Sequence, residues 1–138
     1  MTIEELISYA KDQGFSIFEK ENTYDLQFNK ISDILIQFTL PKEEKSFGKG
    51  TSLTWDVTIK DLISGRRLFY DWAEEYDRID SASKYEIMKS SYHQFIETVT
   101  SHKIRIHEYF LYSLFGRKFG KIREVQYLTD DGWKYLSL

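Results

Sequence analysis

The sequence predicts an α+β fold in which an antiparallel β-sheet meander of about four to six strands packs against two or three helices. Apolar and polar residues alternate over most of residues 15–76, which is the period of strands with one buried face. Before and after this region, apolar residues recur at helical spacing. Residues 1–138 contain no repeat, low-complexity tract or flexible linker, which predicts a single domain.

The first element is predicted to be a helix. Thr2-Ile3-Glu4-Glu5 has the spacing of a capping box, in which a hydroxyl and a carboxylate accept hydrogen bonds from free amides at a helix start. The residues of its apolar stripe are Ile3, Leu6, Ile7 and Ala10. Gly14 can adopt the left-handed conformation that ends many helices.

Strands are predicted in five segments, 15–17, 24–28, 34–38, 53–59 and 68–72, because each alternates between apolar and polar residues. Asn22-Thr23 and Ser64-Gly65 are predicted turns. Residues 41–51 hold the only proline and two glycines without any period, which predicts a long loop.

A second helix is predicted after Ser83-Lys84-Tyr85-Glu86, which repeats the capping-box spacing. Its apolar stripe consists of Met88, Tyr92, Phe95, Ile96 and Val99.

Two interpretations are open for residues 104–115. Ile104 and Ile106 alternate as in a strand, whereas Ile106, Phe110 and Leu114 keep a helical phase. We favour a short helix over residues 106–115, ended by Gly116. Residues 124–136 are predicted to form a hairpin that turns at Asp130-Asp131-Gly132.

Composition excludes several classes of protein. Aromatic residues make up 17% of the 138 residues, which excludes a disordered solvating chain. The absence of cysteine excludes a disulfide scaffold, thiol catalysis and cysteine-ligated zinc. No secretory signal and no stretch of about 20 apolar residues is present, so we expect a cytoplasmic protein that does not enter a membrane. Residues with AT-rich codons predominate, which indicates a low-GC bacterium or one of its phages.

No catalytic constellation is recognisable. The chain lacks a Gly-x-Ser-x-Gly motif, and His93, His102 and His107 are not spaced as metal ligands on one helix. Asp33 followed by Glu43-Glu44-Lys45 has the spacing of a magnesium-dependent nuclease, but the latter residues fall in the predicted loop rather than on a rigid strand. We therefore expect a protein that is not an enzyme, with no catalytic residue, no metal site and no cofactor.

Charge is segregated along the chain, whose formal net charge is −3. Residues 1–101 carry 12 basic and 18 acidic side chains, and residues 102–138 carry 7 and 4. The basic part contains Gly116-Arg117-Lys118-Phe119-Gly120-Lys121, followed by Arg123. Glycines permit close approach, Phe119 offers a stacking surface, and the cations can meet phosphates. The alternative is a basic loop that only neutralises the acidic part.

An acidic and aromatic segment precedes the second predicted helix. Its candidate contact residues are Asp71, Trp72, Glu74, Glu75, Tyr76 and Asp77, and the acidic run extends to Asp80. Trp and Tyr are favoured interface anchors, and carboxylates complement a basic partner surface. The alternative is a solvated strand end with Trp72 in the core.

The favoured hypothesis is a small, non-enzymatic protein-binding module. It would be an inhibitor or accessory factor of the kind encoded by phages and mobile elements, anti-CRISPR or immunity proteins being examples of the type. Its acidic segment would engage a protein with a basic surface, for example one that itself binds nucleic acid. The alternatives are a nucleic-acid-binding accessory domain that uses Arg117, Lys118, Phe119, Lys121 and Arg123, and an enzyme whose site is assembled only in space.

Overall fold

The computed structural model describes residues 3–43, 45–47, 50–76 and 84–137. The described elements are, in chain order, α1 (Ile3–Asp12), β1 (Ser16–Glu19), β2 (Thr23–Phe28), β3 (Ile34–Pro41), β4 (Lys45–Phe47), β5 (Gly50–Asp61), β6 (Arg67–Tyr76), α2 (Lys84–Ser101), β7 (Ile104–Leu114), β8 (Arg117–Thr129) and β9 (Gly132–Tyr135). The architecture is mostly antiparallel β-sheet with two described helices, which is broadly the predicted α+β class.

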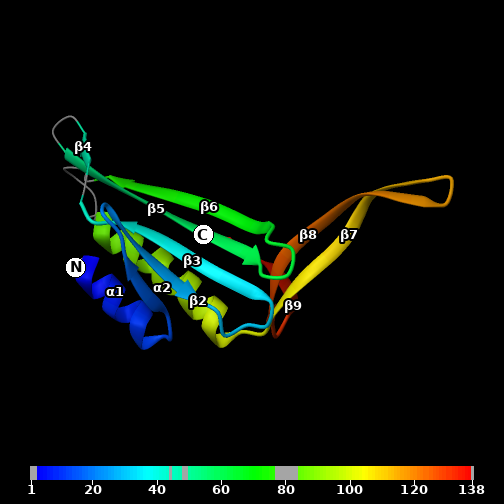
Figure 1. Ribbon diagram of the computed structural model, residues 1–138, viewed down its shortest axis with the longest axis horizontal. Helices are drawn as coiled ribbons and strands as arrows, with labels where there is room; N and C mark the ends of the chain where they lie inside the picture. Colours follow the sequence, from blue (N-terminus) through cyan, green and yellow to red (C-terminus); the bar gives the residue numbers. More distant parts are fainter. Residues whose placement is uncertain (1–2, 44, 48–49, 77–83, 138) are drawn as a thin grey trace.

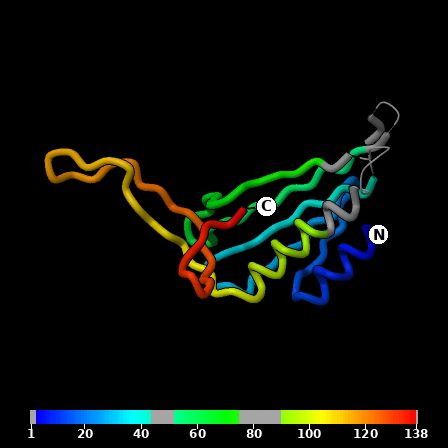
Figure 2. The backbone as a smooth tube through the Cα atoms, turned by 180° about the vertical axis from the view of Figure 1, so that it is seen from behind, coloured from blue at the N-terminus to red at the C-terminus, as the bar shows by residue number. Residues whose placement is uncertain are grey.

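The described strands form two sheets. The main sheet runs β1-β2-β3-β5, with β4 and β6 both paired to the long strand β5, and the small sheet runs β7-β8-β9. Every pairing is antiparallel. Both helices cover the same face of the main sheet. The β7–β8 hairpin projects as a long arm from the end of the molecule that is far from β4 (Figures 1 and 2).

The core lies between the helices and the main sheet. Alternating residues of β3 and β5 point into it, as the sequence predicts, and so do Tyr92, Phe95, Ile96 and Val99 of α2. Phe38 lies at its centre, with ring centroids 5.4 Å from both Tyr92 and Phe95 and 6.0 Å from Trp55. These edge-on and stacked arrangements are the favourable geometries for aromatic pairs.

The end of α1 follows the predicted glycine signal. Gly14 has a φ of 99°, and its N–H donates to the Lys11 carbonyl at 3.0 Å. The Phe15 N–H donates to the Ala10 carbonyl, also at 3.0 Å. Together these two bonds make a Schellman motif, which satisfies carbonyls at the helix end and turns the chain into β1.

The small sheet is attached to the same core. Val125 and Leu136 are buried and belong to the same apolar cluster as the α2 residues Phe95 and Val99. The His102 ring, just beyond α2, lies edge-on to Tyr127 with centroids 5.5 Å apart. The proximal part of the small sheet is therefore packed, whereas its distal part is the arm.

The favoured helix over residues 106–115 is wrong, because this segment belongs to strand β7. Ile106, Phe110 and Leu114 are four residues apart, and an even spacing also places residues on one face of a strand. Gly116 does not end a helix. With φ values of 50° for Phe115 and 73° for Gly116, these residues form the two-residue turn between β7 and β8.

Two further expectations need correction. The predicted loop 41–51 contains β4, which pairs with the first residues of β5 as a short hairpin. In β6 the strand is confirmed, but the alternative that placed Trp72 in the core is wrong. Phe69 and Ala73 pack against the core, whereas Tyr70 and Trp72 are exposed on the opposite face, so Trp72 is not a core residue.

Some predicted features lie outside the described residues. These are Thr2 and Ser83 of the two capping boxes, Glu44 of the nuclease-like triplet, and Asp77 and Asp80 of the acidic segment.

The buried hydroxyl of Tyr92 links the two helices and gives a test of the fold. It donates to the Leu6 carbonyl at 2.8 Å, and burial raises its pKa well above the ordinary value. Tyr92→Phe removes this bond while keeping the ring, so we expect the free energy of unfolding to fall by about 1 kcal/mol. Chemical denaturation measures the change. Tyr112→Phe, on the exposed arm, serves as control and should leave stability unchanged; an equal loss in both variants would contradict this assignment.

Candidate interaction surfaces

The arm, defined as residues 108–121, carries an unusual amount of exposed apolar surface. Its exposed large side chains are Phe110, Leu111, Tyr112, Leu114, Phe115 and Phe119. Phe115 at the turn is 95% exposed and Tyr112 is 66% exposed. Uncovered apolar patches of this kind mark interaction sites, because a folded chain otherwise buries such side chains.

The pairing of β7 with β8 organises the arm. Opposite residues on the two strands are Phe110 and Lys121, Tyr112 and Phe119, and Leu114 and Arg117. Each cation thus lies beside an apolar group, and Lys118 Nζ lies 5.8 Å from the centre of the Phe110 ring. Gly120, inside β8, has a φ of 70°, which is typical of a glycine at a bend or bulge in a strand.

The five residues proposed for nucleic-acid binding divide into two groups. Lys121 and Arg123 are already paired within the chain, Lys121 with Glu108 at 2.8 Å and Arg123 with Asp61 at 2.7 Å. Arg117 and Lys118, together with Phe119, lie near the tip of the arm, and no carboxylate of the described residues pairs with either cation. The tip is therefore basic as well as apolar.

Asp61 fixes the point where the arm leaves the main sheet. Its side chain is almost fully buried, accepts a hydrogen bond from the Ile63 N–H at 3.0 Å, and pairs with Arg123 of β8. The bond from Ile63, followed by those from Ser64 and Arg123, holds the pKa of Asp61 below its ordinary value despite burial. Glu108 also approaches Arg123, at 3.5 Å. We call Asp61, Arg123 and Glu108 the bracket.

The face of the main sheet opposite the helices forms the second surface, which we call the outer face. Cross-strand pairing places Phe18, Asp25, Thr39, Asp56 and Trp72 in one row across β1, β2, β3, β5 and β6. The row is polar in the centre and aromatic at both edges. Trp72 is 56% exposed, and Phe18 is about half exposed.

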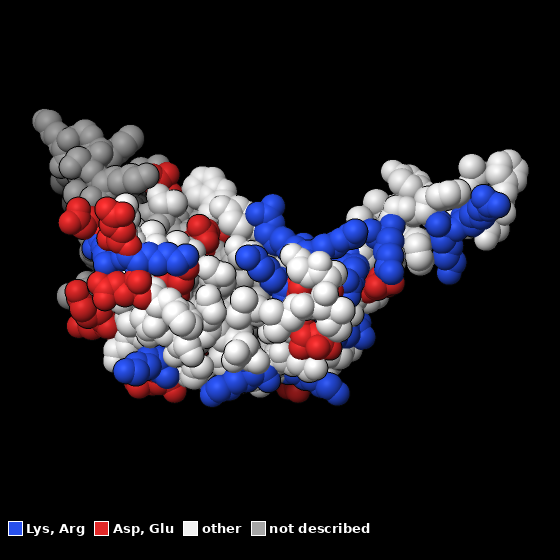
Figure 3. All heavy atoms as spheres, in the orientation of Figure 1, with Lys and Arg blue, Asp and Glu red and all other residues white. Residues whose placement is uncertain are grey.

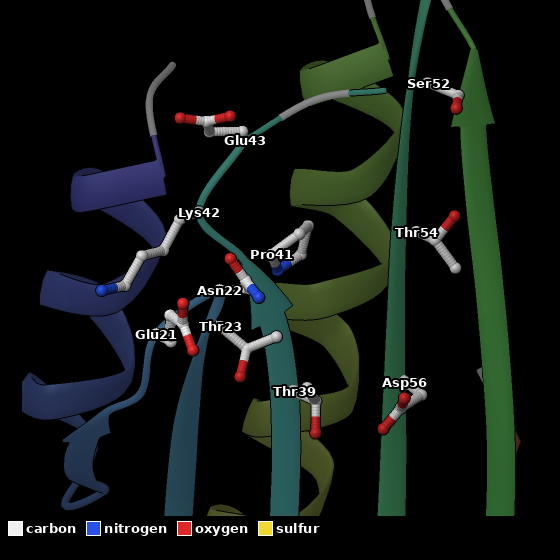
Figure 4. A pocket seen from close by; sticks show the side chains of 10 residues that line it. All are labelled: Glu21, Asn22, Thr23, Thr39, Pro41, Lys42, Glu43, Ser52, Thr54 and Asp56. Atoms are coloured by element: carbon white, nitrogen blue, oxygen red, sulfur yellow. The ribbon is translucent and has the colours of Figure 1, made fainter. Parts of the chain in front are cut away.

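A hollow of about 500 Å³ lies on the outer face. Its lining includes three carboxylates, Glu21, Glu43 and Asp56, and the hydroxyls of the strand residues Thr39 and Thr54. Figure 4 shows these side chains with α2 behind the sheet. Among the described residues that line the hollow, Lys42 is the one cation, and it is paired with Glu19 at 2.7 Å.

Two aspartates beneath the hollow differ in their electrostatics. Asp25 is buried, pairs with Lys20 and accepts a hydrogen bond from Gln37 Nε2 at 3.2 Å. Burial raises the pKa of Asp56, the Thr39 hydroxyl opposes the rise, and the charge of Asp25 adds to it. A cation that approaches Asp56 would favour its charged form and oppose the effects of burial and of Asp25.

The predicted acidic segment is divided between the two faces of β6. Register places Trp72 and Glu74 on the outer face, opposite Asp56 and Thr54, and Asp71 on the helix side, opposite Val57. Asp71 Oδ1 accepts a hydrogen bond from the Trp72 N–H at 2.9 Å. The side chains of Glu75 and Tyr76 lie outside the described part of the structure. Of the predicted patch, the described geometry brings only Trp72 and Glu74 to one face.

The arm and the hollow lie toward opposite ends of the molecule, because the end of β3 and the first part of β5, close to β4, line the hollow. In Figure 3, Lys and Arg line the arm and its attachment, while Asp and Glu gather toward the other end. This spatial separation matches the charge difference between the two parts of the sequence.

The three histidines do not come together. His93 stacks on Tyr9 at 3.7 Å, His102 contacts the Thr98 carbonyl, and His107 lies on β7. Among the described residues, no three His, Asp or Glu side chains are arranged to hold a metal ion. No described helix is long and apolar enough to cross a membrane.

Comparison with protein-family models, curated proteins and solved structures finds no match for this chain. Function is therefore inferred from geometry and charge.

Sequence reasoning missed the row on the outer face. Asp25, Thr39 and Asp56 are far apart in the sequence, and only the pairing of β2, β3 and β5 brings them together. The polar residues that alternate with apolar ones along each strand could have predicted this row. On adjacent strands of one sheet they share the face opposite the core.

The raised pKa of Asp56 predicts a measurable stability effect. Because the folded state disfavours the charged carboxylate, Asp56 destabilises the folded protein at neutral pH, and this penalty is relieved as the pH falls through its raised pKa toward the ordinary range of a carboxyl group. Asp56→Asn removes this penalty, so we expect the variant to be more stable than the parent at pH 7, with a difference that shrinks toward pH 4.5. Denaturant titrations at both pH values measure the effect.

Asp131→Asn, in the exposed β8–β9 turn, removes the same charge and is the matched control. A variant of Asp56 that is less stable than the parent at pH 7, with an unchanged pH profile, would contradict the interpretation.

Proposed function

We propose that this chain is a protein-binding module, not an enzyme, and that the arm is its principal contact element. The observation that supports this most directly is the uncovered apolar surface at the arm tip, led by Phe115 at 95% exposure. The arm projects away from the body, so its tip can enter a groove of a partner (Figure 1).

The chemistry of the tip favours a protein partner over a nucleic acid. Six large apolar side chains are exposed on the arm, against two cations without a carboxylate partner among the described residues, Arg117 and Lys118. Nucleic-acid binding by charge depends on Lys and Arg side chains that neutralise a series of phosphates. A partner groove that is apolar with a carboxylate rim fits the tip better, because it covers the rings and neutralises both cations.

The sequence favoured the acidic segment as the contact surface, whereas this proposal favours the arm. The acidic segment is the second candidate, and its support is the exposed Trp72 beside Glu74 on the outer face. There the partner surface would be basic.

Arm-tip substitutions test the proposal. Leu114→Ser with Phe115→Ser removes the two most distal apolar side chains of β7 and its turn. The matched control is Leu62→Ser with Ile63→Ser, because these residues are also exposed, at 54% and 78%, but lie in the β5–β6 turn. We expect the arm variant to lose at least about tenfold in affinity for a protein captured by the parent from a bacterial lysate, and the control to retain it.

The same experiment includes nuclease treatment of the lysate. Binding that disappears after nuclease treatment would overturn the protein-binding proposal in favour of nucleic acid. Equal affinity of parent and arm variant would overturn the role of the arm.

A further inference from the structure

The arm and the outer face carry complementary features on one chain. We infer that the outer face of a second copy of this chain is the docking site for the arm tip. This inference rests on the proposed function of the arm as a protein-binding element, and it names the partner.

Charge is complementary between the two surfaces. The tip presents Arg117 and Lys118 without a carboxylate partner among the described residues. The hollow on the outer face presents Glu21, Glu43 and Asp56. Because the pKa of Asp56 is raised by burial and by Asp25, an approaching guanidinium or ammonium group relieves an unfavourable charge there.

Apolar surface is complementary as well. The tip carries Tyr112, Leu114 and Phe115, and the outer face carries Trp72, all of them exposed. Trp72 lies opposite Asp56 of β5, so its ring stands on the same face as the hollow and beside one of its carboxylates. Aromatic residues surrounding a charged centre are typical of protein interfaces.

The geometry favours two copies over a contact within one chain. The arm leaves the body at the end far from β4 and the hollow, so the tip of one chain does not lie over its own outer face (Figures 1 and 2). A two-fold rotation places the arm end of each copy beside the hollow end of the other. Each copy then donates one tip and accepts one tip, which closes a symmetric dimer.

Engineered cysteines test this contact cleanly, because the natural chain contains none. Phe115→Cys is made in one preparation and Thr54→Cys in another, since Thr54 is exposed and lines the hollow. We expect the mixed preparations to form a covalent dimer under mild oxidation. The control pairs Phe115→Cys with Ser101→Cys, which is exposed at the end of α2, and should give at least about tenfold less mixed dimer. Equal yields would overturn the contact.

Sedimentation equilibrium supplies a charge test on the intact chain. Arg117→Glu with Lys118→Glu should weaken self-association at least about tenfold, whereas Lys11→Glu with Lys30→Glu, an equal charge change on exposed sites elsewhere, should not. Mixing the arm variant with a Glu21→Lys, Glu43→Lys variant should restore association. Absence of this rescue would overturn the pairing of the tip with the hollow.

The outcomes separate this inference from the proposed function. A parent chain that stays monomeric up to millimolar concentration overturns the second copy as partner. The proposed function stands despite that result if the parent binds a captured protein and the Leu114→Ser, Phe115→Ser variant does not.

Discussion

The buried carboxylate of Asp61 is the constraint on which the shape of the molecule depends. It accepts a hydrogen bond from Ile63 in the β5–β6 turn and pairs with Arg123 of β8, so one side chain joins a turn of the main sheet to a strand of the small sheet. A buried carboxylate needs such partners, since an unpaired charge in the interior is strongly unfavourable. The bracket therefore fixes where β7 and β8 leave the body, while Val125 and Leu136 anchor the small sheet in the core.

On the side of the bracket away from the body, no helix or sheet of the described structure covers the β7–β8 hairpin. A two-stranded ribbon has two faces and little capacity to bury side chains by itself. The apolar residues of the arm, Phe115 foremost, therefore remain in water unless a partner covers them. The same geometry separates charge, because Arg117 and Lys118 lie beside the β7–β8 turn at the tip of the arm, whereas the carboxylates Glu21, Glu43 and Asp56 line the hollow. Both properties make the arm an element suited to intermolecular contact.

Local patterns predicted most of the main sheet and both helices. Strong alternation predicted β3 and β5 as strands, and the apolar stripe predicted α2 as a helix. The glycine after α1 predicted where that helix ends. The arm was missed because Ile106, Phe110 and Leu114 share a face in a strand as well as in a helix. Residue type alone did not decide whether Trp72 lies in the core, because a large aromatic residue suits a core as well as an interface. On this strand the core is packed instead by Phe69 and Ala73, and long-range pairing with β5 decides the face.

The orientation of the arm can be measured directly by pulsed electron–electron double resonance between two spin labels. The labels are attached at Ser113→Cys and Ser101→Cys, and excess unlabelled chain suppresses signals between copies. Both sites are exposed, one on the arm and one at the end of α2. We expect one narrow distance distribution in the parent and a broad one after Arg123→Ala, because the substitution removes the partner of Asp61. A broad distribution in the parent, or a narrow distribution unchanged by Arg123→Ala, would contradict the claim that the bracket holds the arm.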